Sequence, residues 1–360
     1  MAKPPEFRPP LLLRAAGATL SGLWAVSDSL RRPAVPAERD RTLALTVARR
    51  EIVARDENVV ALTLTGLRGQ ALPRWHPGAH LDLHLPSGLI RQYSLCGDPA
   101  EREAYRIAVR RIPAGAGSAG AGSAEVHEAL PVGSTVTTGG PRNAFPLVIP
   151  GYGSPARRLR FIAGGIGITP ILPMLAMAHR LGVDWSMIYV GRNADSIPFR
   201  DEVQRFGTRV RIRTDDLNGV PTADELLGEF HSATAVYVCG PPPLLTAVCE
   251  RLTGRDDVEL HYERFAAPPV VDGAQFSATA VVSGADVVVG PEETLLAALR
   301  RAGVNPPYSC QQGFCGTCRV RVLGGSVQHR DTLLTDAERV DQMLLCVSRA
   351  GPGGHLELEI

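Results

Sequence analysis

Three cysteines fall within nine residues in the stretch Cys310-Gln311-Gln312-Gly313-Phe314-Cys315-Gly316-Thr317-Cys318, and a fourth, Cys346, follows after 27 more residues. This C-x4-C-x2-C…C spacing is the plant-type arrangement of a [2Fe–2S] cluster, which needs four thiolates for its two irons. The two glycines let backbone amides approach the sulfurs. Zinc is one alternative and four unliganded thiols another, but zinc sites usually pair two C-x2-C units, and this stretch holds one. We therefore predict a cluster at Cys310, Cys315, Cys318 and Cys346.

The length and composition of the whole chain exclude several classes of protein. A chain of 360 residues is long enough for two or three domains. Its 44% hydrophobic and 21% charged residues argue against a disordered or coiled-coil chain. A net charge of +1 argues against a nucleic-acid binder that depends on an overall basic field. The seven cysteines are odd in number and clustered, which indicates metal ligation rather than disulfides, and Cys96 and Cys249 are expected to be packing thiols.

Residues 1–40 are predicted to form an N-terminal extension that is partly helical. Apolar residues between Leu11 and Leu30 recur at three- and four-residue steps, which favours an amphipathic helix. A helix that docks on a membrane surface or a partner, and a cleaved signal segment, are the alternatives. Arg14 interrupts the stretch, which is too polar to span a bilayer. We therefore expect a cytoplasmic protein without a transmembrane segment.

Three composition blocks follow this extension. Residues 41–152 hold short alternating runs broken by glycine and proline, which predict an antiparallel β-barrel. Residues 153–267 alternate apolar strands with helical patterns, which predict a parallel α/β sheet. A linker is expected at 268–273, and residues 274–360 combine two strands and a helix with the cysteine loop. In the first block, the run from Gly115 to Ser123 contains only glycine, alanine and serine and is predicted to be flexible.

The sequence Arg91-Gln92-Tyr93-Ser94-Leu95 ends a strand-like run in the first block and has the chemistry to hold a flavin. Tyr93 offers a flat aromatic face, Ser94 a hydroxyl for flavin N5, and Arg91 a cation for a phosphate. A solvated strand end is the alternative interpretation of these residues taken alone. Their position ahead of a nucleotide-type block and the cysteine loop favours the flavin. Ser94 is then a candidate catalytic residue.

The second block carries a glycine-rich turn, Gly164-Gly165-Ile166-Gly167-Ile168-Thr169-Pro170, between a strand and an apolar helix. Glycine lets the backbone approach a diphosphate, and a helix N-terminus offers unpaired amides to it. The G-x-G-x-x-G fingerprint of dehydrogenases is absent. A turn built only for packing is the alternative. We expect four residues of this turn to bind a nicotinamide nucleotide, namely Gly165, Gly167, Ile168 and Thr169.

Together, these blocks resemble the phthalate dioxygenase reductase and vanillate demethylase reductase family of the ferredoxin reductase superfamily. The resemblance covers about residues 41–360 and follows the family's order of flavin barrel, nicotinamide domain and ferredoxin. It implies an antiparallel β-barrel of the ferredoxin-reductase type, an α/β parallel-sheet nucleotide-binding domain and an α+β β-grasp ferredoxin domain. Pro307-Tyr308-Ser309-Cys310, which leads into the cluster loop, resembles the plant-type ferredoxins.

The resemblance also implies further site residues. In that family the flavin is FMN, and a Gly-Gly-Ser-x-x-x-His stretch helps to hold its phosphate. The matching stretch here ends at His127 and contains Gly122 and Ser123, but Ala121 replaces the first glycine. This departure leaves FAD as the alternative flavin. Cys239-Gly240-Pro241 matches the family's Cys-Gly-Pro motif beside the nicotinamide and flavin, so Cys239 is a second candidate catalytic residue, with a core thiol as the alternative. The other implied residues are Arg192, near the adenosine ribose of NADH or NADPH, and Phe265, near the flavin in the domain-closing segment Glu263-Arg264-Phe265.

By this resemblance, the chain is expected to be the reductase component of a two-component oxygenase system, a flavin and iron–sulfur oxidoreductase. Electrons are expected to pass from NAD(P)H, with NADH favoured, through the flavin and the cluster to an oxygenase of the Rieske type or another. A cytochrome P450 or a small acceptor such as a quinone is the alternative acceptor, and a redox sensor is the alternative function. A monomer is expected. Pro141-Arg142-Asn143-Ala144-Phe145 also resembles the family, without an assigned role.

Overall fold

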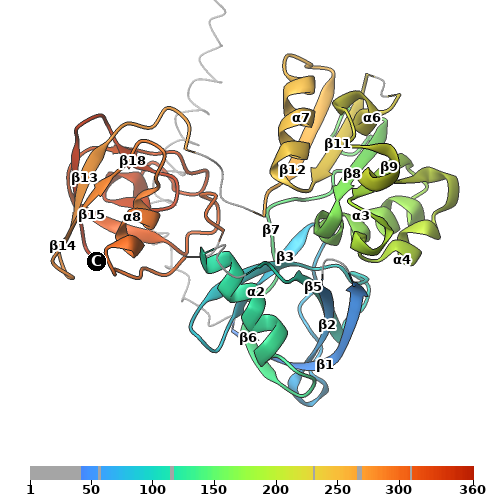
Figure 1. Cartoon of the computed structure of the whole chain (residues 1–360), viewed down its shortest axis with the longest axis horizontal. Coiled ribbons are helices and arrows are strands. Elements are labelled where there is room, and N and C mark those ends of the chain that lie inside the picture. Colours follow the sequence, from blue (N-terminus) through green and yellow to red (C-terminus); the bar gives the residue numbers. More distant parts are fainter. Residues whose placement is uncertain (1–41, 56–57, 114–116, 230–231, 266–269, 309) are drawn as a thin grey trace, which may run out of the picture. The chain divides into compact units, whose positions relative to one another are not determined.

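The computed structural model describes residues 42–360, apart from 56–57, 114–116, 230–231, 266–269 and 309. The predicted N-terminal extension and the first two residues of the predicted linker lie outside the described residues. Thr42–Ile360 form one compact unit, in which three large sheets and one two-stranded sheet follow each other along the chain (Figure 1). No helix among the described residues has the length and apolar character needed to cross a membrane.

The first sheet is a curled antiparallel sheet in the order β4-β3-β6-β1-β2-β5, with β7 paired to β3. Its strands alternate inward apolar and outward residues, and the inward side chains of Leu45, Leu62 and Leu81 are fully buried in one core. The strands are β1 (Leu43–Ala54), β2 (Val59–Gly66), β3 (Ala79–His84), β4 (Ile90–Ser94), β5 (Ala104–Arg110), β6 (Thr135–Thr138) and β7 (Arg142–Asn143).

Helix α2 (Gly117–Ala129) corrects the prediction for the glycine, alanine and serine run, because residues 117–123 are its first half. The sequence offers no apolar stripe over this run, so periodicity could not reveal the helix. The second half carries Val126, which is buried in the barrel core together with Leu130 just beyond the helix. The His127 ring contacts the Val109 carbonyl oxygen at 3.0 Å. Contacts made by this second half hold the helix against the barrel.

The second sheet is parallel, in the order β10-β9-β8-β11-β12. From β8 the chain proceeds to β9 and β10 on one side and then returns to β11 and β12 on the other. The carboxyl ends of β8 and β11 therefore meet at the topological switch point, where sheets of this class bind ligands. The strands are β8 (Arg158–Gly164), β9 (Asp184–Gly191), β10 (Val210–Thr214), β11 (Thr234–Cys239) and β12 (Val258–Glu263).

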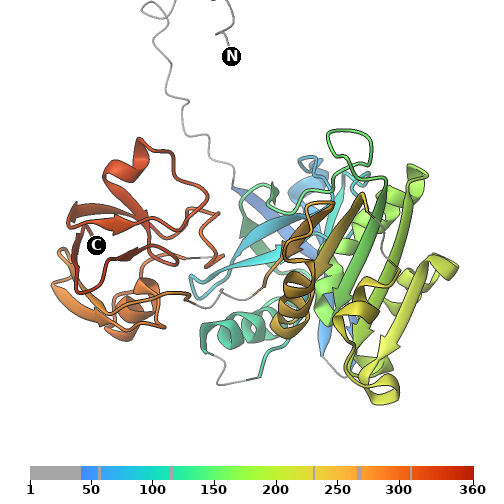
Figure 2. The ribbon, with the colours of Figure 1, turned by 90° about the horizontal axis from the view of Figure 1, so that it is seen from above.

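Helices cover both faces of this parallel sheet, as Figure 2 shows. One face packs against α3 (Ile168–Arg180) and α4 (Arg200–Gln204), and this core continues into the outer face of β2 and β5 through Val59 and Ala108. Cys96 is buried in the same core, which confirms that it is a packing thiol. The other face packs against α6 (Ala223–Leu227) and α7 (Pro242–Leu252), while α5 (Asp215–Asn218) follows the edge strand β10.

The third sheet has the order β14-β13-β19-β15-β17, with β13 parallel to β19 and antiparallel to β14. Helix α8 (Leu295–Arg301) buries Leu295, Leu296 and Leu299 against the sheet, which is the α+β arrangement predicted for this block. The strands are β13 (Phe276–Ala280), β14 (Ala285–Val289), β15 (Arg319–Gly324), β17 (Gln342–Leu344) and β19 (His355–Leu358), and β16 (Val327–Gln328) pairs with β18 (Arg349–Ala350) as a separate ribbon.

Arg106 on β5 joins the barrel to α4 of the parallel sheet. Its two terminal nitrogens each donate to one carboxylate oxygen of Glu202 at 2.8 Å, and one of them also donates to the Cys96 carbonyl at 2.7 Å. The guanidinium carbon lies 4.8 Å from the centre of the Phe199 ring. Bidentate, partly buried pairs of this kind are stronger than exposed ones.

We expect Arg106→Met to lower the free energy of unfolding by about 2 kcal/mol, because it leaves Glu202 and the Cys96 carbonyl without their donor. The measurement is the urea midpoint of the full chain. Arg49→Met is the matched control, since the Arg49–Glu51 pair is exposed and a change within about 0.5 kcal/mol is expected. Equal midpoints for the two variants would show that the Arg106 contact does not stabilise the junction.

Candidate active site and cluster loop

The glycine-rich turn after β8 lies directly against the turn after β11. A Cβ added to Gly167 would lie 2.2 Å from the Cys239 carbonyl oxygen, and one added to Gly240 would lie 3.1 Å from Cα of Gly164. The obstructing atoms belong to the backbone and cannot rotate away, so glycine is required for this approach. The two predicted nucleotide motifs are thus brought together at the switch point of the sheet.

Helix α3 begins at this turn, and no side chain caps its first amides. A helix N-terminus suits a diphosphate. Ile168 is fully buried in the core and its amide donates to the Gly165 carbonyl, while the Thr169 hydroxyl donates to the Ile166 carbonyl at 3.0 Å. The side chains of these two predicted binding residues are therefore engaged within the protein, and they shape the turn.

Ser94, Glu263 and Cys239 meet where the barrel adjoins the parallel sheet. The Ser94 hydroxyl, at the end of β4, donates to Oε2 of Glu263 at 3.3 Å. Glu263 ends β12 and pairs in register with Cys239, which ends β11. Ser94 and Cys239 are both buried. The two predicted catalytic residues therefore both lie next to the carboxyl group of Glu263, for which the sequence predicted no role.

Burial controls the protonation of this group of residues. It raises the pKa of Glu263 to about 8, although the hydrogen bond from Ser94 opposes the rise. Burial also raises the pKa of the Cys239 thiol well above its usual value, and the nearby charge of Glu263 adds to the effect. At neutral pH, Glu263 therefore holds a proton and Cys239 is a thiol, so the centre offers protons without a fixed charge.

Arg91 and Gly122 lie together beside the barrel, as a phosphate site requires. A Cβ added to Gly122 would lie 2.6 Å from Nε of Arg91, so glycine makes room for the guanidinium. Arg91 also donates to the Tyr308 hydroxyl at 3.2 Å, which connects this site to the residues before the cluster loop. Tyr93 is partly buried, and burial raises the pKa of its phenol despite the charge of Arg91. The residues that were predicted to hold a flavin are therefore adjacent.

Ser123 and His127, by contrast, bond to protein groups. The Ser123 hydroxyl donates to the Gly120 carbonyl and accepts from the Ile112 amide, both at 3.0 Å. The His127 ring contacts the Val109 carbonyl, and burial lowers the pKa of this histidine. In this arrangement both side chains position helix α2.

Arg192 and Phe265 lie at the carboxyl edge of the parallel sheet. Arg192 follows β9 and is exposed, and its carbonyl accepts from the Asp216 amide at 3.0 Å. Phe265 follows β12 with half of its surface exposed. Because all strands of a parallel sheet end on the same edge, both residues lie on the side of the nucleotide turn.

The four thiols predicted to bind the cluster lie close together, with Cys310 beside Cys315 and Cys346, and with Cys318 beside Cys346. The Gln312 amide donates to Sγ of Cys310 at 3.3 Å. A [2Fe–2S] cluster needs four thiolates, which these residues can supply. The donor set therefore fits a two-iron cluster.

The cluster loop contacts the end of β12 through Gln312. Its side-chain amide donates to the Arg264 carbonyl at 2.5 Å. Arg264 lies between Glu263, which bonds to Ser94, and Phe265. The segment that borders the candidate catalytic centre therefore also borders the cluster loop.

A second contact joins the cluster loop to the barrel through Arg142. Its guanidinium donates to the Cys315 carbonyl at 3.1 Å and forms an ion pair with Asp82 on β3. The His80 ring packs edge-on against Phe314, with 6.1 Å between ring centres. Arg142, for which the sequence predicted no role, therefore connects the barrel to the cluster loop.

The comparisons with known proteins agree with this architecture. The family of 2Fe-2S iron-sulfur cluster binding domains matches residues 281–351. The chain is 39% identical over 323 residues to the putative toluene-4-sulfonate monooxygenase system reductase subunit TsaB2 of Comamonas testosteroni, covering 88% of this chain and 98% of that protein. It is 38% identical over 320 residues to vanillate O-demethylase oxidoreductase of Pseudomonas sp. (strain HR199 / DSM 7063), covering 86% and 97%. The chain also resembles the solved structure of phthalate dioxygenase reductase, which is described as a modular structure for electron transfer from pyridine nucleotides to [2Fe–2S]. The two structures align with a TM-score of 0.63 and are 32% identical in sequence, and the alignment covers 89% of this chain and 98% of that one.

The raised pKa of Glu263 predicts a pH-dependent stability. An unfolded glutamate loses its proton near pH 4.5, whereas folded Glu263 keeps it to about pH 8. Between these values the unfolded chain binds fewer protons, so stability falls as pH rises, by about 1.4 kcal/mol per pH unit, and levels off above pH 8. Glu263→Gln cannot ionise and is expected to lack this decline.

Urea midpoints of the parent and of Glu263→Gln at pH 5, 7 and 9 measure the difference. We expect the variant to be stabilised relative to the parent, increasingly from pH 5 to pH 9. Glu128→Gln, at an exposed position, is the control that should follow the parent. Parallel pH profiles for the parent and Glu263→Gln would contradict the assignment of a protonated Glu263.

Proposed function

This chain belongs to the phthalate dioxygenase reductase and vanillate demethylase reductase family, and on that premise we propose which of its residues bind the cofactors and guide the electrons. It is the reductase component of a two-component oxygenase system and an oxidoreductase that uses nicotinamide nucleotide, flavin and a [2Fe–2S] cluster. The proposed domains are 41–152 for flavin, 153–267 for nucleotide and 274–360 for the cluster. Strands β1–β7, β8–β12 and β13–β19 fall within these ranges.

The nucleotide is proposed to bind at the switch point. Gly165, Gly167, Ile168 and Thr169 would border its diphosphate, because they form the turn that leads into the N-terminus of α3, which no side chain caps. Cys239 and Gly240 would border the nicotinamide, since their turn packs against Gly167. Arg192 would face the adenosine ribose.

The flavin, which we propose to be FMN, would have Arg91 and Gly122 at its phosphate and Tyr93 and Ser94 at its ring, with Phe265 nearby. Ser123, whose hydroxyl bonds to the Gly120 carbonyl and the Ile112 amide, would contribute by positioning helix α2. When bound, the flavin converts the two-electron donation of a hydride into the single-electron steps that an iron–sulfur cluster accepts. Ser94 would present its hydroxyl to the flavin, and Glu263 would orient that hydroxyl and hold a proton behind it.

The contact between Gln312 and the Arg264 carbonyl is the main support for the proposed electron route. The Arg264 carbonyl accepts from Gln312, so the segment Glu263–Phe265 contacts both the hydroxyl of Ser94 and the loop of the cluster cysteines. Arg142 adds a second contact at the Cys315 carbonyl. The flavin residues and the cluster residues therefore lie on two sides of one short segment, which suits direct transfer within one chain.

The final acceptor is proposed to be the Rieske-type oxygenase component of the same system. A Rieske centre accepts single electrons, which matches what a [2Fe–2S] cluster delivers. We further propose a cytoplasmic monomer, because one chain carries all of the predicted cofactor residues and the cytoplasm keeps cysteines reduced for ligation. NADH is proposed as the donor, as the family resemblance implies.

Cys315→Ser tests the route through the cluster. We expect at least a tenfold lower rate of NADH-driven cytochrome c reduction, because the cluster loses one ligand, while anaerobic bleaching of the flavin by NADH stays at the parental rate. Stopped-flow absorbance and steady-state assays measure the two steps separately. Cys249→Ser, which changes a thiol outside the loop, is the matched control and should retain both rates. Cytochrome c reduction at the parental rate in Cys315→Ser would refute the route.

A further inference from the structure

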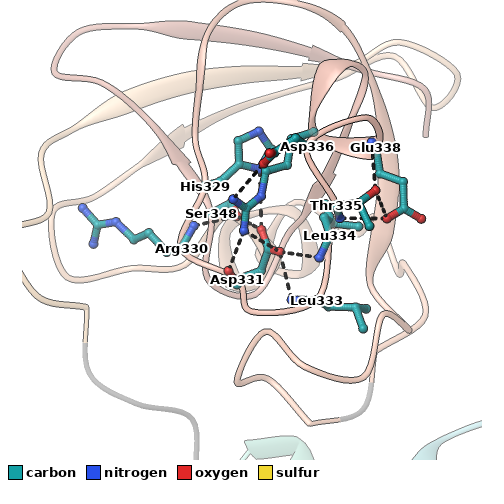
Figure 3. A network of polar contacts seen from close by, with 10 residues as sticks. His329, Arg330, Asp331, Leu333, Leu334, Thr335, Asp336, Glu338 and Ser348 are labelled. Carbon is teal, nitrogen blue, oxygen red and sulfur yellow. Dashed lines mark hydrogen bonds and ion pairs between the residues drawn. The ribbon is translucent and has the colours of Figure 1, made fainter. Parts of the chain in front are cut away.

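Asp331 is a buried carboxylate that belongs to none of the sites described above, and its turn contacts the cluster loop. Figure 3 shows the polar contacts around it. Its side chain has no exposed surface. Carboxylates are rarely buried in this way unless they are paired and hydrogen-bonded, because removal from water is costly. No motif in the sequence pointed to Asp331, although its turn contacts the loop that carries three of the predicted cluster ligands.

The surroundings of Asp331 keep it charged. Burial would raise its pKa, but the Leu334 amide and the Arg339 charge outweigh burial and hold the pKa below its usual value. The amides of Leu334 and Leu333 donate to Oδ2 at 2.8 and 3.2 Å, and the Ser348 hydroxyl donates to Oδ1 at 3.5 Å. Arg339 lies 3.6 Å from Oδ2. His329 Nδ1 lies 3.5 Å from Oδ1. At neutral pH Asp331 itself is therefore ionised.

The Asp331 turn contacts both segments that carry cluster cysteines. The Thr332 amide donates to the Gly313 carbonyl at 3.2 Å, and a Cβ added to Gly313 would lie 3.2 Å from Cα of Asp331. Gly313 lies between Cys310 and Cys315 and has a φ of +80°. On the other side, Ser348 is two residues beyond Cys346. Asp331 thus joins the loop of three predicted ligands to the turn that carries the fourth.

A fixed negative charge at this place affects the cluster electrostatically. Reduction adds one electron to the cluster, and a nearby carboxylate in a medium of low dielectric constant disfavours that electron. Arg339 compensates only in part, because a third of its side chain is exposed and solvent screens its charge. The net effect of the pair on the cluster is therefore that of the carboxylate.

We propose that Asp331 is a positioning residue that holds the cluster loop against the Cys346 segment and lowers the reduction potential of the cluster. This inference rests on the proposed cluster ligands. A lower potential makes the reduced cluster a stronger one-electron donor to the oxygenase. The charge of Asp331 and that of Arg339 then act on the potential in opposite directions.

Two charge variants of the full chain test this inference by the sign of their effects. Asp331→Asn removes the negative charge but keeps an oxygen that can accept from the Leu333 and Leu334 amides. We expect its cluster to be reduced about tenfold more readily, an upward shift of about 59 mV for a one-electron couple. Arg339→Gln removes the positive charge, and its midpoint potential is expected to shift downward.

Anaerobic redox titration, followed by the paramagnetic resonance of the reduced cluster, measures both midpoints. Ser348→Ala removes a contact to Asp331 without a change of charge, and a shift well below that of Asp331→Asn is expected. Opposite shifts for the two charge variants support the inference, since a merely structural role has no reason to invert the sign. Unchanged potentials, or shifts in one direction for both, overturn it.

The presence or absence of a cluster signal distinguishes a failure of this inference from a failure of the proposed function. A parental chain that shows no cluster signal after chemical reduction would refute the ligand assignment itself. A parental chain with a normal signal, together with an iron-free Asp331→Asn, leaves the decision to Arg339→Gln. A downward shift in that variant then supports an electrostatic effect of the Asp331–Arg339 pair on the potential, and no shift overturns the inference.

Discussion

The close approach of two backbone turns at the switch point of the parallel sheet is the constraint on which the rest of the site depends. Gly167 and Cys239 touch through backbone atoms, and no residue with a Cβ fits at position 167 without moving the strands apart. This contact sets where Cys239 lies and, through the register of β11 with β12, where Glu263 lies. The position of Glu263 then decides its distance to Ser94 on the barrel.

Glu263, the last residue in this register, and the two residues after it connect the three parts of the protein. Glu263 accepts a hydrogen bond from Ser94 of the barrel, the Arg264 carbonyl accepts one from the cluster loop, and Phe265 follows at the carboxyl edge of the parallel sheet. A short segment at the end of an edge strand can do this because it has neighbours on one side only, which leaves the other side open to a further domain. The geometry therefore favours electron transfer within one chain.

The sequence predicts the parts of the site that depend on local spacing. The four cysteines and the glycine turn are recognisable because their chemistry follows from neighbours along the chain. Glu263, Arg142 and Asp331 are not recognisable in this way, because each acts on a residue far away in sequence. Helix α2 was mispredicted for a related reason, since contacts of its second half with the barrel, rather than an apolar stripe over its first half, stabilise it.

The near-neutral charge of the whole chain does not determine the electrostatics of the cluster. A charge contributes according to its distance from the cluster and its exposure, and charges beyond about 10 Å in solvent are largely screened. Asp331 is enclosed, whereas its partner Arg339 is partly exposed, so the two do not cancel at the cluster. A chain with nearly equal numbers of acidic and basic residues can therefore place its cluster in a negative local field. The arrangement of a few enclosed charges, which composition cannot reveal, decides how readily the cluster gives up its electron.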